Sequence, residues 1–400
     1  MQKTVLTIAV LGLLGIAGLA FDARGGIQGQ GLTYVAGALV GGLAGFALYH
    51  ASFGFTAAWR RMTRERRGAG LRAQMMLFAM TCAVTYLLIG YEDVTGWNMH
   101  PVVMPMGLSS ALGAFVFGIG MQLGGGCASG TLFTTGGGSS RMLVVLLFFV
   151  LGSVWATAHI PEFWRKLPEL TGVPNIRGTS MITELGPLGA LAALFGFCAL
   201  VIWATKRIEI SAHGALEPVR PTENLLTGKW SLMLGAVGLA AVGVLCFLVF
   251  QRPWGVTAGF ALWGAKLIQT VGVPVQEWTY WQGWRANVLE GSLFAHRTSL
   301  MNFGIVFGAM AAAALAGQFK PTLNLSTRDL VTAVIGGLMM GYGARLSYGC
   351  NIGAYLGGVV SGSLHGWWWL IWGFAGSLLG TRLRGMLDMD PPLTRGRAIG

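Results

Sequence analysis

Two cysteines in this sequence lie in matching glycine-rich segments. The segments are GIGMQLGGGCASG at 118–130 and GYGARLSYGCNIG at 341–353, and six of their thirteen positions are identical, in the pattern G-x-G-x-x-L-x-x-G-C-x-x-G. Glycines before a cysteine let the backbone bend and leave N–H groups unscreened by side chains. A bend of this kind beside helix ends forms a concave anion site. The thiols of Cys127 and Cys350 add a soft, polarisable sulfur and a weak hydrogen-bond donor.

The two bends would act together if the fold brought them side by side. Cys127 and Cys350 would then line the narrowest part of one path, and the preceding Gly126 and Gly349 would leave backbone amides open to a ligand. Such a path suits an anion that itself carries sulfur. The alternative for a single copy is a packing device around a small buried cysteine, but two matching copies favour a functional site.

Polar residues close to these cysteines differ between the two segments. Arg345 precedes Cys350 by five residues, whereas its counterpart Gln122 is polar but neutral. An arginine buried in a membrane is costly unless it is paired or lines water. Arg345 therefore either attracts an anion toward the second thiol, or extends to the interface, to a carboxylate or to backbone carbonyls. Ser129 and Asn351 flank the thiols, where they could donate hydrogen bonds to a ligand or satisfy broken backbone.

The composition indicates what kind of protein must hold these segments. Of the 400 residues, 54% are hydrophobic and only 10% are charged, whereas soluble domains carry roughly 25% charged residues. This excludes a soluble enzyme, a disordered chain and a fibre. It predicts an all-α polytopic integral membrane protein that is not an enzyme.

The remaining charge does not indicate nucleic acid or metal as a partner. The net charge of +12 comes largely from basic residues between apolar runs, which is typical of cytoplasmic loops, and no nucleic-acid-binding motif is present. The six histidines are scattered without metal-ligand spacing. We therefore expect no nucleic-acid partner, no metal and no cofactor.

Eleven apolar segments are candidate membrane helices. They are 4–20, 31–50, 73–90, 109–123, 142–159, 185–205, 231–250, 255–272, 300–317, 329–346 and 364–380. The arginine-rich stretch 60–72, the polar linker 206–229 and the tail 381–400 are typical of cytoplasmic loops, whereas 91–108 has two acidic residues and no basic one and favours the outside. Eleven full crossings would place the termini on opposite sides, but re-entrant segments would change that parity, so the topology stays open.

The Gly-Cys segments also indicate an internal duplication. A second match, AGFALYHA at 44–51 and AGFALWGA at 258–265, occurs once in each half and in the same order. The expected organisation is a first membrane repeat at 1–205, a polar linker at 206–229, a second membrane repeat at 230–385 and a polar tail at 386–400. Segments 109–123 and 329–346 are short and glycine-broken, and such pairs point to the substrate path of a transporter. The sequence does not show whether the halves are parallel or inverted.

These motifs resemble those of a known family. The paired elements at 118–130 and 341–353 look like the hallmark of the YeeE/YedE family of bacterial sulfur transporters, which includes thiosulfate uptake proteins. The segment GFALYHASFGFTAAWR at 45–60 is similar to the first motif of that family. The resemblance implies a helical inner-membrane protein with an hourglass shape and short helices that point inward. It also implies that a sulfur anion passes along thiols by transient hydrogen bonds, with Cys127 and Cys350 as the two central thiols.

One position departs from the family pattern. Family members that carry thiosulfate commonly have a cysteine between the two aromatics of the first motif, where this sequence has Gly54 in Phe53-Gly54-Phe55. A relay of three thiols is therefore incomplete, so either two thiols suffice or the substrate differs. Some relatives also carry an appended soluble sulfur-carrier domain, and here we expect such a partner to be a separate cytoplasmic protein.

Together these features predict a multi-pass protein of the bacterial inner membrane. We expect it to take up a small sulfur-containing anion, thiosulfate first, along a thiol-lined path through the lipid bilayer. Two alternatives stay open. One is a membrane sulfur-transfer or redox subunit in which a cysteine forms a persulfide, and the other is a carrier of another sulfur or selenium anion.

Overall fold

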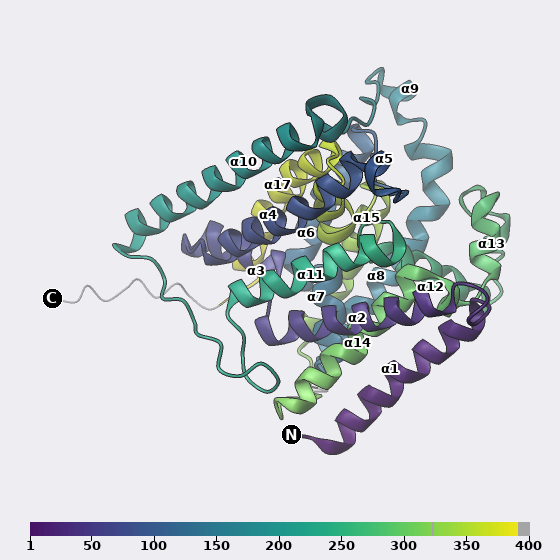
Figure 1. The fold of residues 1–400 in the computed structure, drawn as a ribbon, viewed down its shortest axis with the longest axis horizontal. Helices are drawn as coiled ribbons and strands as arrows, with labels where there is room; N and C mark the ends of the chain where they lie inside the picture. Colours follow the sequence, from purple (N-terminus) through teal and green to yellow (C-terminus); the bar gives the residue numbers. More distant parts are fainter. Residues whose placement is uncertain (322–323, 391–400) are drawn as a thin grey trace.

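Helices make up the regular structure of this protein. Its fold, in a computed structural model, is described for residues 1–321 and 324–390, so part of the predicted tail 386–400 lies outside the described residues. Nine candidate membrane spans stand out in the described chain by length and hydropathy, and α17 is a further long helix of 23 residues. Several of the long helices run along a common direction in Figure 1. The predicted all-α polytopic membrane architecture is confirmed.

Long helices form the bundle, and shorter helices connect or interrupt them. The long ones are α1 (Lys3–Ala23), α2 (Gly31–Ala51), α4 (Ala69–Gly90), α6 (Leu108–Gly124), α8 (Ser140–His159), α10 (Met181–His213), α11 (Leu232–Phe250), α14 (Arg297–Leu315), α15 (Thr327–Leu346) and α17 (Leu364–Met386). The short α-helices are α3 (Phe55–Arg60), α5 (Glu92–Thr95), α7 (Ala128–Gly136), α9 (Leu167–Thr171), α12 (Thr257–Gln269), α13 (Trp284–Glu290) and α16 (Gly357–Val360). Single turns of other helix types are η1 (Arg61–Glu65), η2 (Ile160–Trp164), η3 (Val275–Glu277), η4 (Thr279–Trp281), η5 (Leu293–Ala295) and η6 (Asn351–Leu356).

Several of the long helices lead into a short helix. α2 leads into α3, α6 into α7, α11 into α12, and α15 into η6. The predicted segments 109–123 and 329–346 are continuous within α6 and α15, so their glycines do not interrupt them. The interruptions lie in the polar turns that follow these two helices, at 125–127 and 347–350.

Glycines let neighbouring helices pack with their backbones in contact. α6 and α15 lie antiparallel: a methyl group added to Gly343 would lie 2.5 Å from the carbonyl oxygen of Gly113, and one added to Gly120 would lie 2.9 Å from that of Gly336. α2 and α14 pack in the same close manner. Lipid provides no hydrophobic drive for helices to associate, so close van der Waals contact between small residues takes its place. This packing accounts for much of the glycine that the sequence contains.

Ion pairs hold distant parts of the chain together at one end of the bundle. Arg61, after α3, pairs with Glu217, after α10, at 2.8 Å. Arg64 pairs with Asp390, after α17, at 3.2 Å. The stretches with cytoplasmic character therefore lie side by side. α4 runs from this end to the 91–108 stretch, which lies at the opposite end as expected.

An even number of crossings would place both ends of the described chain on the same side of the membrane. The nine candidate spans and α17 would give ten crossings, because α12, within the predicted segment 255–272, has only 13 residues and is too short to cross. The backbone N–H of Gln2 donates to the carbonyl of Ala314 near the end of α14 at 2.8 Å. The 60–72 stretch at this end has six arginines, so by the positive-inside rule we expect this end to face the cytoplasm.

The helices follow the same order in two halves of the chain. The series α2, α3, α4, α6, α7, α8 is matched by α11, α12, α14, α15, η6, α17, and the Gly-Cys turns follow α6 and α15. Because α6 and α15 lie antiparallel, these matched helices cross in opposite directions. AGFALYHA, however, ends α2 whereas AGFALWGA begins α12, so this second sequence match does not join equivalent positions. An internal duplication stays a prediction, and the opposite directions of the matched helices are those of inverted halves.

α10 extends beyond the predicted limit of the first half. It continues to His213, so the first part of the predicted linker 206–229 is helical. Glu209 fixes this extension, because its fully buried carboxylate accepts hydrogen bonds from Arg72 at 2.7 Å and Arg67 at 3.2 Å. Removing one partner of such a buried charge is strongly destabilising. The helix extension is therefore part of the charged end of the bundle and not a free linker.

The close contact between α2 and α14 predicts a stability loss from a single methyl group. In Gly304→Ala the new methyl would lie 2.7 Å from the carbonyl oxygen of Ala38, a backbone atom that cannot move aside alone. We expect a loss of about 1–3 kcal/mol and a lower melting temperature of the purified protein in detergent. Gly18→Ala is the matched control, because a methyl there meets no atom within 4 Å. Equal melting temperatures for the two variants would contradict the close packing.

Two exposed valines test the orientation in the membrane. Val94 in α5 and Val219 after α10 are both 82% exposed, and the five native cysteines are buried, so an added thiol is the reactive one. In intact cells we expect a membrane-impermeant maleimide to label Val94→Cys, and to label Val219→Cys only after the membrane is opened. The reverse pattern would invert the assigned orientation.

Candidate functional site

The first Gly-Cys segment forms a turn that places its thiol at the start of a short helix. α6 ends at Gly124, Gly125 is left-handed with φ of 88°, and Cys127 is the N-cap of α7. The Cys127 Sγ atom lies 3.4 Å from the hydroxyl of Ser129. A methyl group on Gly130 would lie 3.6 Å from the same sulfur, so the first turn of α7 leaves bare backbone beside the thiol. The thiol therefore lies at the positive end of a helix.

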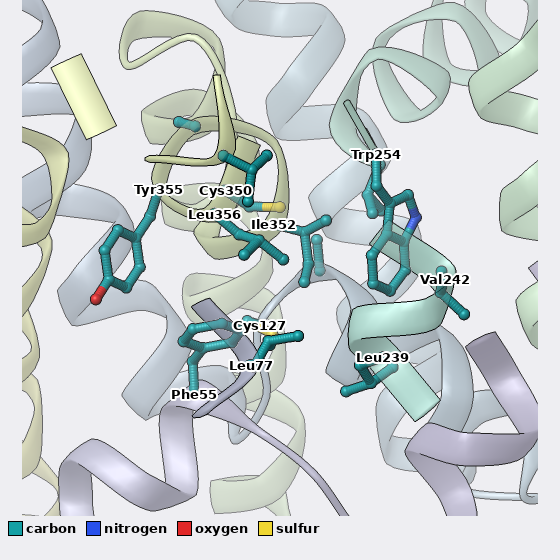
Figure 2. Close-up of a cluster of buried hydrophobic side chains, with 14 of the residues drawn as sticks. Phe55, Leu77, Cys127, Leu239, Val242, Trp254, Cys350, Ile352, Tyr355 and Leu356 are labelled. Carbon is teal, nitrogen blue, oxygen red and sulfur yellow. The ribbon is translucent and has the colours of Figure 1, made fainter. Parts of the chain in front are cut away.

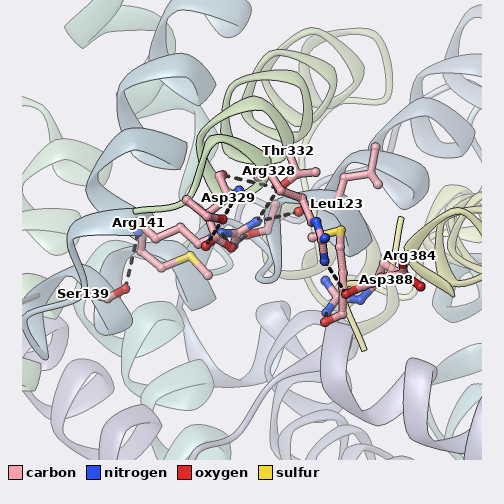
Figure 3. Close-up of polar contacts among 12 residues, drawn as sticks. Leu123, Ser139, Arg141, Arg328, Asp329, Thr332, Arg384 and Asp388 are labelled. Atoms are coloured by element: carbon pink, nitrogen blue, oxygen red, sulfur yellow. Dashed lines mark hydrogen bonds and ion pairs between the residues drawn. The ribbon is translucent and has the colours of Figure 1, made fainter. Parts of the chain in front are cut away.

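Two arginines hold the end of α6 that precedes this turn (Figure 3). Arg141 of α8 donates to the carbonyl oxygens of Leu123 at 2.9 Å and Gly124 at 2.5 Å. Arg384 of α17 donates to the carbonyl of Gln122 at 2.7 Å. The last carbonyls of a helix lack partners within the helix and carry partial negative charge, so cations stabilise them. These contacts fix the direction in which the chain leaves α6.

An aspartate holds one of these arginines in place. Arg384 donates to Asp390 at 2.6 Å. Burial by itself raises the pKa of Asp390, but the hydrogen bond from Arg384 and the nearby charges of Arg60 and Arg64 outweigh it, so this pKa lies below its ordinary value. The carboxylate thus stays ionised at neutral pH and keeps Arg384 directed at the end of α6.

The second Gly-Cys segment makes the corresponding turn at the end of α15. Tyr348 is left-handed with φ of 64°, and Cys350 is the N-cap of η6. The hydroxyl of Ser347 donates to the carbonyl of Gly343 at 2.8 Å and accepts from the indole N–H of Trp369 at 3.1 Å. Neutral groups therefore form the hydrogen bonds at the end of α15, whereas two arginines bind the carbonyls at the end of α6.

The glycines that precede the two cysteines allow each turn to fold back on the next helix. A methyl group on Gly349 would lie 2.8 Å from the backbone nitrogen of Ala354, and one on Gly126 would lie 3.4 Å from the carbonyl carbon of Gly130. A side chain at Gly349 would thus displace η6, whereas Gly126 has slightly more room. Both glycines contribute to the shape of the turns.

The two thiols lie in one cluster of buried side chains (Figure 2). Cys127 is 2% exposed and Cys350 is 0% exposed, and both belong to the same core cluster. The short helices that begin at these cysteines contact each other. Figure 2 also shows Phe55, Leu77 and Ile352 in this cluster. The fold therefore brings the two predicted thiols into one region, among apolar side chains.

Gln122 and Arg345 occupy matching positions and contact matching helices. The Gln122 side chain donates to the carbonyl of Thr56 on α3 at 3.1 Å and to the hydroxyl of Ser377 at 2.8 Å. Arg345 donates to the hydroxyl of Thr257 on α12 at 2.8 Å, and its Nε has no hydrogen-bond partner. Gln122 thus joins α6 to α3 and α17. Arg345, in contrast, has an Nε–H group that is available to donate to a ligand.

Several buried polar groups around the thiols lack a hydrogen-bond partner. Asn351, beside Cys350, is fully buried, and neither its amide nitrogen nor its oxygen is bonded. The indole N–H of Trp254, before α12, and the hydroxyl of Thr56, in α3, are also unbonded. An unmade hydrogen bond in a buried place costs about 1–3 kcal/mol, so each of these groups calls for a partner such as a ligand or water. The amide nitrogen of Asn351, the indole N–H of Trp254 and the hydroxyl of Thr56 are available donors for an anion.

Sequence reasoning identified some of these polar residues and missed others. It included Ser129 and Asn351 because they flank the cysteines, but it missed Thr56, Thr257 and Trp254. Trp254 follows a proline in a short polar break between two apolar runs, which is the kind of break that also marks the cysteine turns. That signal was present in the sequence. Thr56 and Thr257 have no comparable feature in the sequence around them.

Gly54 lies in the turn between α2 and α3 and has free space around it. It is the N-cap of α3, between the buried side chains of Phe53 and Phe55. A methyl group on Gly54 would meet no atom within 4 Å. The position at which the sequence departs from the YeeE/YedE pattern can therefore accept a Cβ atom without displacing a neighbour.

Comparison with known proteins adds independent information. The family described as sulphur transport matches residues 50–379. The thiosulfate transporter TsuA of Spirochaeta thermophila is 27% identical over 346 residues, which cover 83% of this chain and 93% of that protein. TsuA of Escherichia coli is 23% identical over 344 residues, which cover 83% and 89% of the two chains.

A second kind of relative matches over a shorter stretch. The probable transporter YedE of Escherichia coli is 33% identical over 153 residues, and the aligned part is 38% of this chain and 37% of YedE. The family match, in contrast, extends from the end of α2 into α17 and includes both cysteine turns. The protein therefore belongs to the sulphur transport family, and these relatives of it are named transporters.

Proposed function

We propose that this protein takes up a small sulfur-containing anion, thiosulfate first, across the bacterial inner membrane along a path between Cys127 and Cys350. The observation that supports this most directly is the pair of matching turns, with each thiol at a helix N-cap and both in one buried cluster. The relatives named thiosulfate transporters, which align over 83% of this chain, support the choice of anion.

The chemistry of the two turns suits an anion with a terminal sulfur. A thiol is a weak donor with a soft, polarisable sulfur, so it can exchange hydrogen bonds with a terminal sulfur without holding the anion too tightly to leave. Cys127 begins α7, whose N-terminus adds partial positive charge. The unbonded N–H groups of Asn351 and Trp254 supply further donors. Together these groups replace part of the hydration that the anion loses.

Passage along this path requires side chains to move. Cys127 and Cys350 are buried, and so are Leu77 and Ile352 in the same cluster, at 0% and 1% exposure. An apolar constriction of this kind excludes water until side chains and short helices rearrange. We infer that the thiols become accessible in turn as an anion displaces these neighbours, and that the constriction closes behind it.

Alanine substitutions test whether the thiols line the path. We expect Cys127→Ala and Cys350→Ala each to lower the initial rate of radiolabelled thiosulfate uptake by cells about tenfold, since a hydrogen bond to a charged group is worth about 1.5–3 kcal/mol. Cys246→Ala is the matched control, because Cys246 in α11 is equally buried, at 1% exposure. Unchanged uptake in both test variants would refute the thiol path.

Serine substitutions separate hydrogen-bonded passage from covalent sulfur transfer. Cys127→Ser and Cys350→Ser keep a donor at each place but cannot form a persulfide. Uptake that is partly retained by the serine variants supports the path. Complete loss, together with mass spectra of the wild-type protein that show an added sulfur on either cysteine after exposure to thiosulfate, would favour transfer with release of sulfite.

Replacement of Gly54 by cysteine is expected to increase thiosulfate uptake. Because a methyl group there meets no atom within 4 Å, we expect Gly54→Cys to fold like the wild type and to raise thiosulfate uptake roughly twofold or more by adding a third thiol donor. Two variants serve as controls. Gly54→Ala adds the Cβ atom without a thiol, and Ala57→Cys adds a thiol at an exposed position of α3. The same gain in Gly54→Ala would show a steric effect and contradict a role for the thiol.

A further inference from the structure

A cavity of about 650 Å³ at the end of the bundle opposite the charged cluster of Arg61 and Arg64 gathers arginines from distant parts of the chain. Its arginines are Arg24, Arg252, Arg285, Arg297 and Arg345. The first follows α1 and the second follows α11, whereas the other three lie in α13, α14 and α15. Among the described residues that line this cavity none is acidic. Cations concentrated in a cleft of this kind create a strong positive potential.

Aromatic rings support several of these arginines. The guanidinium of Arg285 lies 4.5 Å from the ring centres of both Tyr280 and Trp284. That of Arg24 lies 4.2 Å from the ring centre of Tyr34. A cation over a ring face is held in place by the ring quadrupole, which does not cancel its charge as a carboxylate would. The arginines are thus positioned while their charge stays available.

Buried donors in this cavity also lack partners. Nε of Arg24, one Nη of Arg297 and Nε of Arg345 make no hydrogen bond with any residue that the structure describes. Burial, together with the charges of these three arginines, lowers the pKa of His296 in the same cavity to about 4, so its imidazole is neutral at physiological pH. An anion in the cavity would satisfy these donors and offset the mutual repulsion of the arginines.

Arg345 connects this cavity to the second cysteine turn. It lies in the last turn of α15, in the segment that leads to Cys350. It also lines an adjoining cavity of about 280 Å³ together with Arg165 and Arg285. The cavity arginines and the Gly-Cys segment therefore share a residue, so the arginine cavity adjoins the second cysteine turn.

We propose that the arginine cavity is a separate binding site that collects small divalent oxyanions, thiosulfate among them, before they reach the cysteines. A cleft lined by charge of one sign raises the local concentration of its counter-ion and the rate of binding. The inference rests on the proposed function only for the identity of the transported anion. Binding of a divalent oxyanion to the arginines does not require that the cysteines carry it.

Equilibrium dialysis of the purified protein in detergent, against radiolabelled thiosulfate and radiolabelled sulfate, measures this site directly. We expect the double variant Arg252→Gln/Arg285→Gln to raise the Kd for both anions about tenfold or more, since it removes two charged donors. Arg177→Gln is the matched control, because Arg177 is an exposed arginine before α10 that does not line the cavity. Cys127→Ala/Cys350→Ala is expected to bind both anions like the wild type.

The outcomes separate this site from the transport path. Wild-type affinity in the double arginine variant, or no saturable binding by the wild type, would overturn the proposal. Loss of binding in the double cysteine variant would also overturn it, because the arginines and thiols would then form one site.

A lipid phosphate has the same chemistry as a free oxyanion, so the measurement is repeated in phosphatidylcholine nanodiscs with and without phosphatidylglycerol. Unchanged affinity supports a site for free anions, whereas competition by phosphatidylglycerol would assign the arginines to lipid. Normal binding without any uptake would refute the proposed transport function and leave this site standing.

Discussion

A helix that ends inside a folded protein leaves backbone carbonyls that neither water nor lipid can reach, so the protein itself must supply their partners. The turn after α6 depends on this constraint, and Arg141 and Arg384 bind its last carbonyls. The turn after α15 is satisfied by Ser347, which Trp369 in turn holds. Arg384 lies on α17, far along the chain from the turn after α6, and Trp369 lies on the same helix, whereas Arg141 begins α8 and Ser347 belongs to the turn after α15 itself. The geometry around each cysteine is therefore a property of the assembled bundle, and the local glycine-rich sequence only makes it possible.

Local signals explain why the helical class and the two cysteine turns were predictable from the sequence. Composition alone excludes a soluble fold, and the repeated pattern places Cys127 and Cys350 at equivalent positions before the structure is known. The contacts of Gln122 and Arg345 required the fold, since their partners lie on α3 and α12. The AGFAL match misled because alanine, glycine and leucine are frequent in any membrane helix. The crossing number also required the structure, because hydropathy does not distinguish the 13-residue α12 from a full span.

The arginine cavity shows a second limit of sequence reasoning. Each of its arginines, taken alone, is typical of a loop or helix end at a membrane surface. Nothing in their spacing links Arg24 to Arg345, because five separate elements bring the set together. The contacts of these arginines with aromatic rings also cannot be predicted from the sequence, since the aromatic stretch around Tyr280 and Trp284 indicates only an interfacial position. What distinguishes the cluster is that none of the described residues that line it is acidic, which is visible only in three dimensions.

The two ends of the bundle also differ in how their arginines are neutralised. Arg141 and Arg384 bind helix carbonyls and pair with Asp329 at 3.5 Å and Asp390 at 2.6 Å. The cavity at the other end is lined by arginines and, within the part of the chain that the structure describes, by no acidic residue, and its Arg345 lies in the segment that leads to Cys350. In the proposed path an anion is therefore attracted more strongly from that end. Fixed charges alter how fast and how fully a site is loaded, but they cannot drive net flux, because both directions pass the same barrier. Accumulation inside the cell thus requires a gradient, or a reaction that consumes the anion on the cytoplasmic side.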